Sequence, residues 1–221
     1  TTNKTKRFWP YQKLEKQDFE SSIPVLGKML KGLLASAHSR YPLAVSLSSG
    51  LDSRLVLAAC KDFITDIPVY SLIYRNLTED SDDVAVPVQM AKKLGFDHTV
   101  FDCRSTTNDE IRELYQRNVK GLKVNWVDIV AGRVNHIPSD KVILKGTISE
   151  IMRCRYFGLG IHPPRITLRD IVALMALGDA PLVVENLRSW FEEAKPYAKK
   201  YGVKILDLLS WEIEVSNWYD M

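Results

Sequence analysis

The chain has 221 residues, of which 46% are hydrophobic and 26% are charged, and its formal net charge is +3. A chain of this length and composition can bury a substantial core, which excludes a disordered polypeptide and favours a globular domain. The 30 basic and 27 acidic residues nearly balance and are spread along the sequence. The net charge is therefore far below what clustered binding of a long nucleic acid would suggest. We therefore expect no nucleic-acid partner.

The cysteines and the start of the sequence indicate where the protein works. Cys60, Cys103 and Cys154 have neither the spacing of metal ligands nor that of a disulfide framework, so we expect reduced thiols and a cytoplasmic protein. No apolar run is long enough to span a membrane, and no hydrophobic segment follows the basic start, so we expect neither a membrane span nor a signal peptide. The first residue is Thr1 rather than Met, which suggests an excised piece of a longer protein.

Helical and strand patterns begin to alternate at residue 23. Apolar residues at helical spacing predict a helix over residues 23–38, with Ser21 and Ser22 as caps. The apolar run 41–47 is typical of a buried strand, and helical periodicity returns over 52–63.

The alternation continues through the middle of the chain. It predicts strands over 67–74, 97–103 and 141–146, and helices over 80–95, 108–119 and 126–136. Strands that alternate with helices in this way imply right-handed parallel crossovers, and therefore an α/β fold with a doubly wound parallel sheet.

The last part of the chain, residues 150–219, has helical periodicity and no clear strand. We therefore expect an α/β domain over residues 1–160, which includes the N-terminal helix. Residues 161–221 are expected to form a helical C-terminal part of the same domain.

The stretch SLSSGLDSR, residues 46–54, places small polar residues directly after the first predicted strand. In open α/β sheets, ligands bind at the carboxyl ends of the strands, where loops lead into helix N-termini. Gly50 permits close approach of the backbone, and the dipole of the next helix favours an anion, most simply a phosphate. Hydroxyl donors, and a carboxylate that a divalent cation would bridge to the phosphate, come from Ser48, Ser49, Ser53 and Asp52.

A plain helix cap would account for less of this stretch. Ser49 or Asp52 could cap a helix after a tight turn, which explains one or two of the polar residues but not all of them. A Walker-type loop is excluded because no Gly-Lys-Ser/Thr follows, and a dinucleotide fingerprint is excluded because the three-glycine spacing is absent. The four histidines are unclustered, and we expect structural or surface roles for them.

SSGLDS, residues 48–53, resembles the SGGxDS pyrophosphate loop of the N-type ATP pyrophosphatases (PP-loop family), and its surroundings are most similar to the synthetase domain of the asparagine synthetases. Three later segments add to this likeness. SDDVAVPVQMAKKLGFDHTVF is similar to the family's second helix and third strand, VILKGTISEIMRCRYFG to the strand and its Ser-Gly-Glu-Gly-Ser-Asp-Glu loop, and WEIEVSNWYDM to a later helix. The resemblance runs from about Phe8 to the C-terminus.

The resemblance implies an ATP site that is completed by magnesium. The loop of residues 48–53 would hold the ATP phosphates, and Gly146 matches the first glycine of the second motif. Asp52 and Glu150 would be the two magnesium carboxylates. The other implied contacts are Leu47 and Ile73 beside adenine and ribose, and phosphate donors at Ser48, Ser49, Gly50 and Ser53.

Three basic residues near the second motif are further candidates. Lys145 is placed to reach a phosphate, although a lysine that ends a strand is common on surfaces. Arg153 and Arg155 could bind a phosphate or a substrate carboxylate bidentately, and the alternative is a solvated basic turn.

The resemblance also implies the chemistry. A carboxylate attacks the α-phosphorus of ATP to give an acyl-adenylate and pyrophosphate, and an amine then gives the amide and AMP. We therefore expect ATP and Mg²⁺ as cofactors and a small-molecule carboxylate as the acceptor. The family's glutamine-hydrolysing domain uses an N-terminal cysteine, and no cysteine precedes Cys60. A separate glutaminase domain or subunit would have to supply ammonia.

The sequence departs from the family at several positions. Ser49 replaces the second glycine of the pyrophosphate loop, Thr147 and Ile148 replace polar and small residues, and a residue is missing after Glu150. Because this second loop shapes the acceptor pocket in the family, we expect an acceptor other than plain aspartate. Two alternatives stay open: another ATP pyrophosphatase, such as a tRNA-modifying or NAD synthetase-like enzyme, and a degenerate nucleotide-binding module without catalysis.

Overall fold

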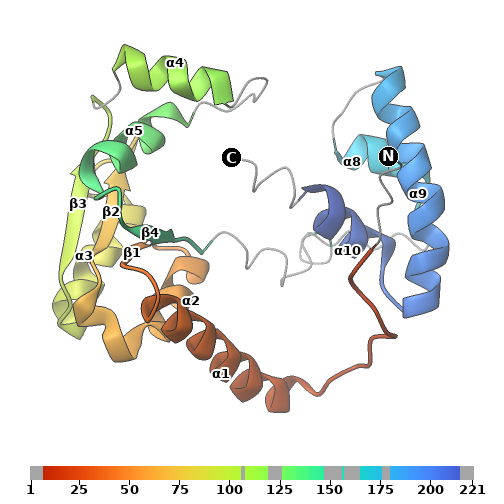
Figure 1. The fold of residues 1–221 in the computed structure, drawn as a ribbon, viewed down its shortest axis with the longest axis horizontal. Helices are drawn as coiled ribbons and strands as arrows, with labels where there is room; N and C mark the ends of the chain where they lie inside the picture. Colours follow the sequence, from red (N-terminus) through yellow and green to blue (C-terminus); the bar gives the residue numbers. More distant parts are fainter. Residues whose placement is uncertain are drawn as a thin grey trace. The chain divides into compact units, whose positions relative to one another are not determined.

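A computed structural model describes residues 7–105, 108–118, 126–146, 156, 165–175 and 180–214 (Figure 1). Residue contacts divide the chain into two compact units. Asp18–Ser149 forms one of them, which we call the sheet unit. Thr1–Gln17 and Glu150–Met221 together form the other, which we call the helical unit.

The described part of the sheet unit contains a parallel sheet of four strands: β1 (Leu43–Ser46), β2 (Val69–Ile73), β3 (His98–Asp102) and β4 (Val142–Leu144). Their order across the sheet is β3-β2-β1-β4, and all neighbouring pairs are parallel (Figure 1). This order confirms the predicted doubly wound α/β fold. The direction of winding changes between β1 and β4, and the carboxyl ends of strands at such a switch point are where open α/β sheets bind ligands.

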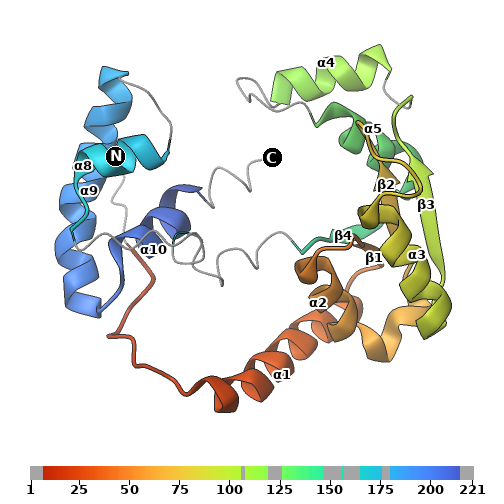
Figure 2. The ribbon, with the colours of Figure 1, turned by 180° about the vertical axis from the view of Figure 1, so that it is seen from behind.

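The first helices of the sheet unit are α1 (Phe19–His38), α2 (Leu51–Ala59) and α3 (Asp82–Leu94). Alternate residues of β1 point to opposite faces of the sheet. Leu43, Val45 and Leu47 pack into one cluster together with side chains of these three helices. Ala44 belongs to a second cluster, which includes side chains from β2 and from the segment around α5 (Val127–His136). Figure 2 shows the sheet and α5 from behind. A parallel sheet needs such cover on both faces.

The start of α1 differs from the prediction. The helix begins at Phe19, several residues before the predicted range 23–38, because the carboxylate of Asp18 accepts a hydrogen bond of 2.9 Å from the backbone N–H of Ser21. The predicted caps, Ser21 and Ser22, therefore lie inside the first turn, and both of their hydroxyls donate to the carbonyl of Asp18.

The other predicted helices of the sheet unit agree more closely with the structure. The helix predicted over 52–63 is shorter in the structure: α2 ends at Ala59, and a 3₁₀ helix over Lys61–Asp66 follows. The three remaining predictions, over 80–95, 108–119 and 126–136, correspond to α3, α4 (Asp109–Asn118) and α5.

The described part of the helical unit contains α8 (Leu168–Leu174), α9 (Pro181–Tyr201), α10 (Ile205–Leu209) and a π-helical turn (Ser210–Glu214). Residues 7–17 run along these helices. The N–H of Leu14 donates to the carbonyl of Tyr201 at 3.1 Å, and the hydroxyl of Tyr197 donates to the carbonyl of Pro10 at 2.5 Å. This grouping of the N-terminal segment differs from the predicted division at residue 160; that the two units form one domain stays a prediction.

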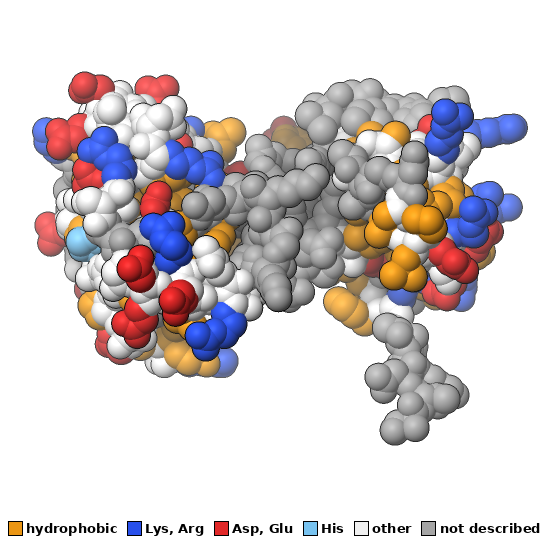
Figure 3. Space-filling view, turned by 90° about the horizontal axis from the view of Figure 1, so that it is seen from above, with side chains coloured by type: hydrophobic (Ala, Val, Ile, Leu, Met, Phe, Trp, Pro, Cys, Tyr) orange, Lys and Arg blue, Asp and Glu red, His pale blue; other side chains and the backbone are white. Residues whose placement is uncertain are grey.

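Charged side chains of both signs are interspersed on the face shown in Figure 3. Among the described helices, none is both long and apolar enough to cross a membrane. The thiols of Cys60 and Cys103 are buried, and burial raises the pKa of each to about 11, so both are protonated at neutral pH. Cys154 lies outside the described residues.

Candidate functional site

The candidate site lies at the corner where the chain leaves β1 at Ser46 and enters α2 at Leu51. The N-cap residue of α2 is Gly50, and no side chain caps the helix. Its first-turn N–H groups and the positive end of its dipole therefore face this corner, an arrangement that suits an anion such as a phosphate. The simpler interpretation, in which Ser49 or Asp52 is the N-cap, is wrong.

Two serines of the corner hold its shape from inside. The buried hydroxyl of Ser53 lies 3.1 Å from the carbonyl of Ser48 and 3.2 Å from the carbonyl of Gly50, and it accepts from the N–H of Ser48 at 3.1 Å. The hydroxyl of Ser48 accepts from the N–H of Gly50 at 3.2 Å. Both hydroxyls were predicted as phosphate donors, and here they bind the loop itself.

Ser49 points its donors toward another element. Its hydroxyl donates to Oδ1 of Asp83 at 2.5 Å, and its backbone N–H donates to the same oxygen at 3.2 Å. Asp83 lies in the first turn of α3. Asp83 was not predicted as a site residue, because an aspartate at the start of a helix is ordinary. The only signal was the SDD segment, which resembles the start of the family's second helix.

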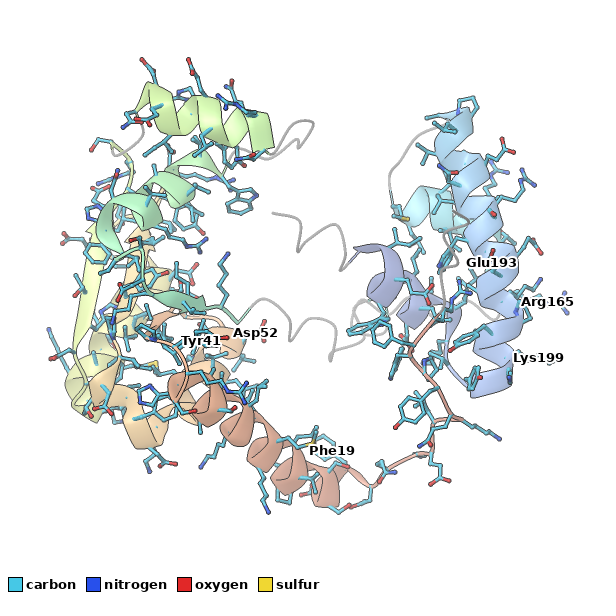
Figure 4. The ribbon with its side chains drawn as sticks, in the orientation of Figure 1. Phe19, Tyr41, Asp52, Arg165, Glu193 and Lys199 are labelled. Carbon is cyan, nitrogen blue, oxygen red and sulfur yellow. The ribbon has the colours of Figure 1, made fainter. Side chains whose placement is uncertain are left out.

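Gly146 joins the second predicted loop to the first. It follows β4, and a Cβ atom placed on it would lie 2.5 Å from the carbonyl carbon of Asp52 and 2.5 Å from the backbone nitrogen of Ser53. These are backbone atoms, which cannot turn aside as the end of a side chain can, so only glycine fits. The structure therefore brings Gly146 against the start of α2, where Figure 4 shows the side chain of Asp52.

Lys145, the other candidate at the end of β4, lies beside a second cation. Partial burial and, to a smaller extent, the charge of Arg133 on α5 lower the pKa of the Lys145 amine. Nε of Arg133 is buried and has no hydrogen-bond partner in the described part of the chain. Lys145 was among the predicted site residues, whereas Arg133 was not.

Leu47 and Ile73, the predicted neighbours of adenine and ribose, are 2% and 3% exposed. Leu47 is held at its carbonyl, which accepts a hydrogen bond of 2.7 Å from the buried hydroxyl of Ser71 on β2. The same hydroxyl lies 2.9 Å from Nε2 of His98 on β3. His98 therefore has a hydrogen-bond partner inside the protein, in line with the structural role predicted for it. Together, side chains of β2 and β3 hold Leu47, the first residue after β1.

The remaining predicted residues, Glu150, Arg153 and Arg155, lie outside the described residues. Within the described ranges, no three His, Cys, Asp or Glu side chains gather as a metal site. The donor set that is described fits magnesium in part, because Asp52 offers the hard carboxylate oxygen that this ion prefers, beside a corner suited to phosphate.

The fold and the corner together define an α/β protein of the doubly wound class, with a candidate anion site at the switch point of its sheet. Residues 33–117 match the family model described as asparagine synthase, which confirms the resemblance to an asparagine synthetase-like synthetase domain. At the level of the family, the match indicates an ATP-dependent, amide-forming ligase. It includes the corner and Asp83 and ends before Gly146. No curated protein matches the chain.

Proposed function

We propose that this chain binds ATP with magnesium at the corner between β1 and α2, and that it activates a carboxylate as an acyl-adenylate for amide formation. The observation that carries the proposal is the contact between Gly146 and the start of α2. This contact supports the proposal because it joins the two loops to which the family resemblance assigns the nucleotide.

The reaction has two steps. An oxygen of the acceptor carboxylate bonds to the α-phosphorus, the bond from that phosphorus to the bridging oxygen of the β-phosphate breaks, and pyrophosphate leaves. An amine then bonds to the acyl carbon and loses a proton, the bond from that carbon to the phosphate oxygen breaks, and AMP leaves. The first step needs little covalent help from the protein, since it depends on positioning and on stabilising the negative charge that develops.

The residues of the corner suit that task. The uncapped first turn of α2, beginning at Gly50, would bind the leaving pyrophosphate. Asp52 would hold magnesium together with Glu150, and the ion would offset the charge of the β- and γ-phosphates. The serines at 48 and 53 would keep the loop in its phosphate-binding shape.

Other residues would bind the rest of the substrates. Leu47 and Ile73 would border the adenine and ribose, and Lys145 would reach a phosphate. Arg153 and Arg155 would bind an acceptor carboxylate, because a guanidinium matches a carboxylate bidentately. The acceptor would be a small-molecule carboxylate other than aspartate, and a separate glutaminase domain or subunit would supply ammonia.

Isotope exchange of labelled pyrophosphate into ATP tests the first step directly. With magnesium and a panel of carboxylates, we expect exchange with at least one acceptor. Asp52→Asn should lower the exchange rate by roughly 100-fold or more, since it removes charge stabilisation at the reacting phosphates. Asp62→Asn is the matched control, because Asp62 is an exposed acid in the 3₁₀ helix that follows α2, and it should leave the exchange unchanged.

Thermal unfolding separates the alternatives. A higher Tm with magnesium and ATP, but no exchange with any carboxylate, would favour a nucleotide-binding module without catalysis. No change in Tm at millimolar ATP would contradict nucleotide binding itself.

A further inference from the structure

The corner already binds a carboxylate of the protein. The hydroxyl and the backbone N–H of Ser49 both donate to Oδ1 of Asp83, at 2.5 and 3.2 Å. Ser49 belongs to the loop before α2, whereas Asp83 comes from α3, which follows β2 in the chain. Two donors that a phosphate loop would turn toward its ligand are therefore satisfied by an anion from a neighbouring element.

The stronger of these two bonds is a feature of this chain. Ser49 stands where the resemblance places a glycine, and a glycine would offer the N–H but no hydroxyl. Both Ser49 and Asp83 are half-buried, so water screens the carboxylate less than it would on an open surface. The first turn of α3 adds its dipole, which favours a negative charge at that position.

We propose that the negative charge of Asp83, which Ser49 holds in place, makes nucleotide binding at this corner depend on magnesium. This inference rests on the proposed function, since it concerns the same ATP site. Free ATP carries about two more negative charges than its magnesium complex, so a fixed carboxylate beside the phosphates repels free ATP more strongly.

The other charges near the corner do not remove this difference. Asp52 adds a second carboxylate, while the guanidinium of Arg54 approaches the carbonyl of Gly50 at 3.4 Å and Lys145 ends β4. The two cations attract both forms of the nucleotide. The negative charge of Asp83 acts against that attraction, and it does so more for the form with the larger charge.

The test compares two dissociation constants measured by isothermal titration calorimetry: one for ATP with excess magnesium, and one for ATP with EDTA. We expect the wild type to bind the magnesium complex much more tightly. For each variant we take the ratio of the Kd measured with EDTA to the Kd measured with excess magnesium. In Asp83→Asn this ratio should fall by about 10-fold or more, because a unit charge beside the phosphates is removed. The asparagine keeps an oxygen that accepts from Ser49, so the change removes the charge but not the hydrogen bonds.

Asp82→Asn is the matched control. Asp82 is the exposed neighbour of Asp83 in the same turn of α3, and its removal should leave the ratio unchanged. Ser49→Gly provides a second variant that tests the inference without altering α3. It frees the carboxylate from its 2.5 Å hydrogen bond, and the ratio should fall in the same direction, by about 3-fold. Circular dichroism checks that each variant is folded.

The outcomes distinguish this inference from the proposed function. One outcome is that the wild type binds ATP with magnesium while Asp83→Asn and Ser49→Gly show the same ratio of dissociation constants as the wild type. In that case the inference is overturned and the proposed function stands. A wild type that binds both forms of ATP equally well also overturns the inference. If the wild type binds neither form, the proposed function fails and the inference fails with it.

Discussion

His98 is a titratable residue at the edge of the candidate site, and its protonation state follows from its hydrogen bond and its burial. The hydroxyl hydrogen of Ser71 goes to the carbonyl of Leu47, so the serine oxygen must accept from Nε2–H of His98. Burial lowers the pKa of His98 below its usual value of 6.5. The histidine is therefore neutral in the folded protein over a range of pH in which the unfolded chain binds a proton.

This difference predicts a loss of stability in mild acid. As the pH falls below about 6.5, the unfolded chain takes up a proton at His98 before the folded protein does, so the free energy of unfolding decreases until the folded pKa is passed. Urea unfolding at pH 7.5 and pH 5.5 measures the effect. His98→Gln keeps an N–H donor without titrating, and it should lose less stability than the wild type between these two pH values. Equal losses in the two proteins would contradict the prediction.

Residue types explain which parts of the site could be predicted from the sequence. The cluster of small polar residues after β1 pointed to the corner, because such residues are unusual between two apolar runs. Asp83 and Ser71 could not be found in this way. Their partners, Ser49 and Leu47, are distant in the sequence, and only the folded sheet brings these pairs within hydrogen-bond distance.

At the scale of elements, the end of β4 is fixed against the first turn of α2. Ala at position 146 would place its Cβ 2.5 Å from two backbone atoms, so either β4 or α2 has to shift. We expect Gly146→Ala to lower the free energy of unfolding by about 1–3 kcal/mol, as overpacking does in other cores. The shift should also weaken ATP binding, since it moves the corner. Urea unfolding and calorimetric titration with ATP and magnesium measure the two effects.

Gly32→Ala is the matched control for this substitution. Gly32 lies inside α1, and a Cβ atom there would meet nothing within 4 Å. Alanine is the better helix former, so this variant should be more stable than the wild type by up to about 1 kcal/mol. If Gly146→Ala is as stable as Gly32→Ala, the close contact between β4 and α2 is not a constraint on the fold.

Elements were predictable where their apolar pattern is strong. β1 and β2 consist almost wholly of buried residues, and the alternation of strands with helices indicated the parallel sheet. Ends of helices were less predictable, because a side-chain cap decides them. Asp18 rather than a serine begins α1, and Phe63 interrupts the predicted continuation of α2 with non-helical backbone angles.

At the scale of the whole molecule, the N-terminal segment was the least predictable part. Residues 7–17 have no period, so the sequence gives no sign that they pack along α9 and the turn after α10. They are held there by single contacts, such as the 2.7 Å ion pair between Arg7 and Glu212 and the backbone hydrogen bond of Leu14. Such contacts depend on three-dimensional arrangement, which no local pattern encodes.

We expect the nucleotide to slow amide hydrogen exchange in the two units to different extents. Each unit has its own buried cluster, so we expect each to unfold as its own cooperative unit. ATP with magnesium at 100 times its dissociation constant should stabilise the sheet unit by about 2.7 kcal/mol and slow exchange of its core amides about 100-fold. Amides of α9 should be slowed much less, because in the helical unit only residues near the start of its second segment, such as Glu150, are assigned to the site. Hydrogen exchange read by mass spectrometry measures both, and equal slowing in both units would contradict this prediction.

The position of β4 beside β1 also has a consequence for the order of events during synthesis. β1, β2 and β3 emerge from the ribosome in succession, and each can pair with the strand before it. β4 joins β1 across all of the intervening chain, and such distant pairings form slowly. The corner is therefore half built, with Asp52 in place and Gly146 still unmade, until translation passes that glycine. A nascent chain that pauses earlier would have three paired strands but only the first of the two loops to which we assign the nucleotide.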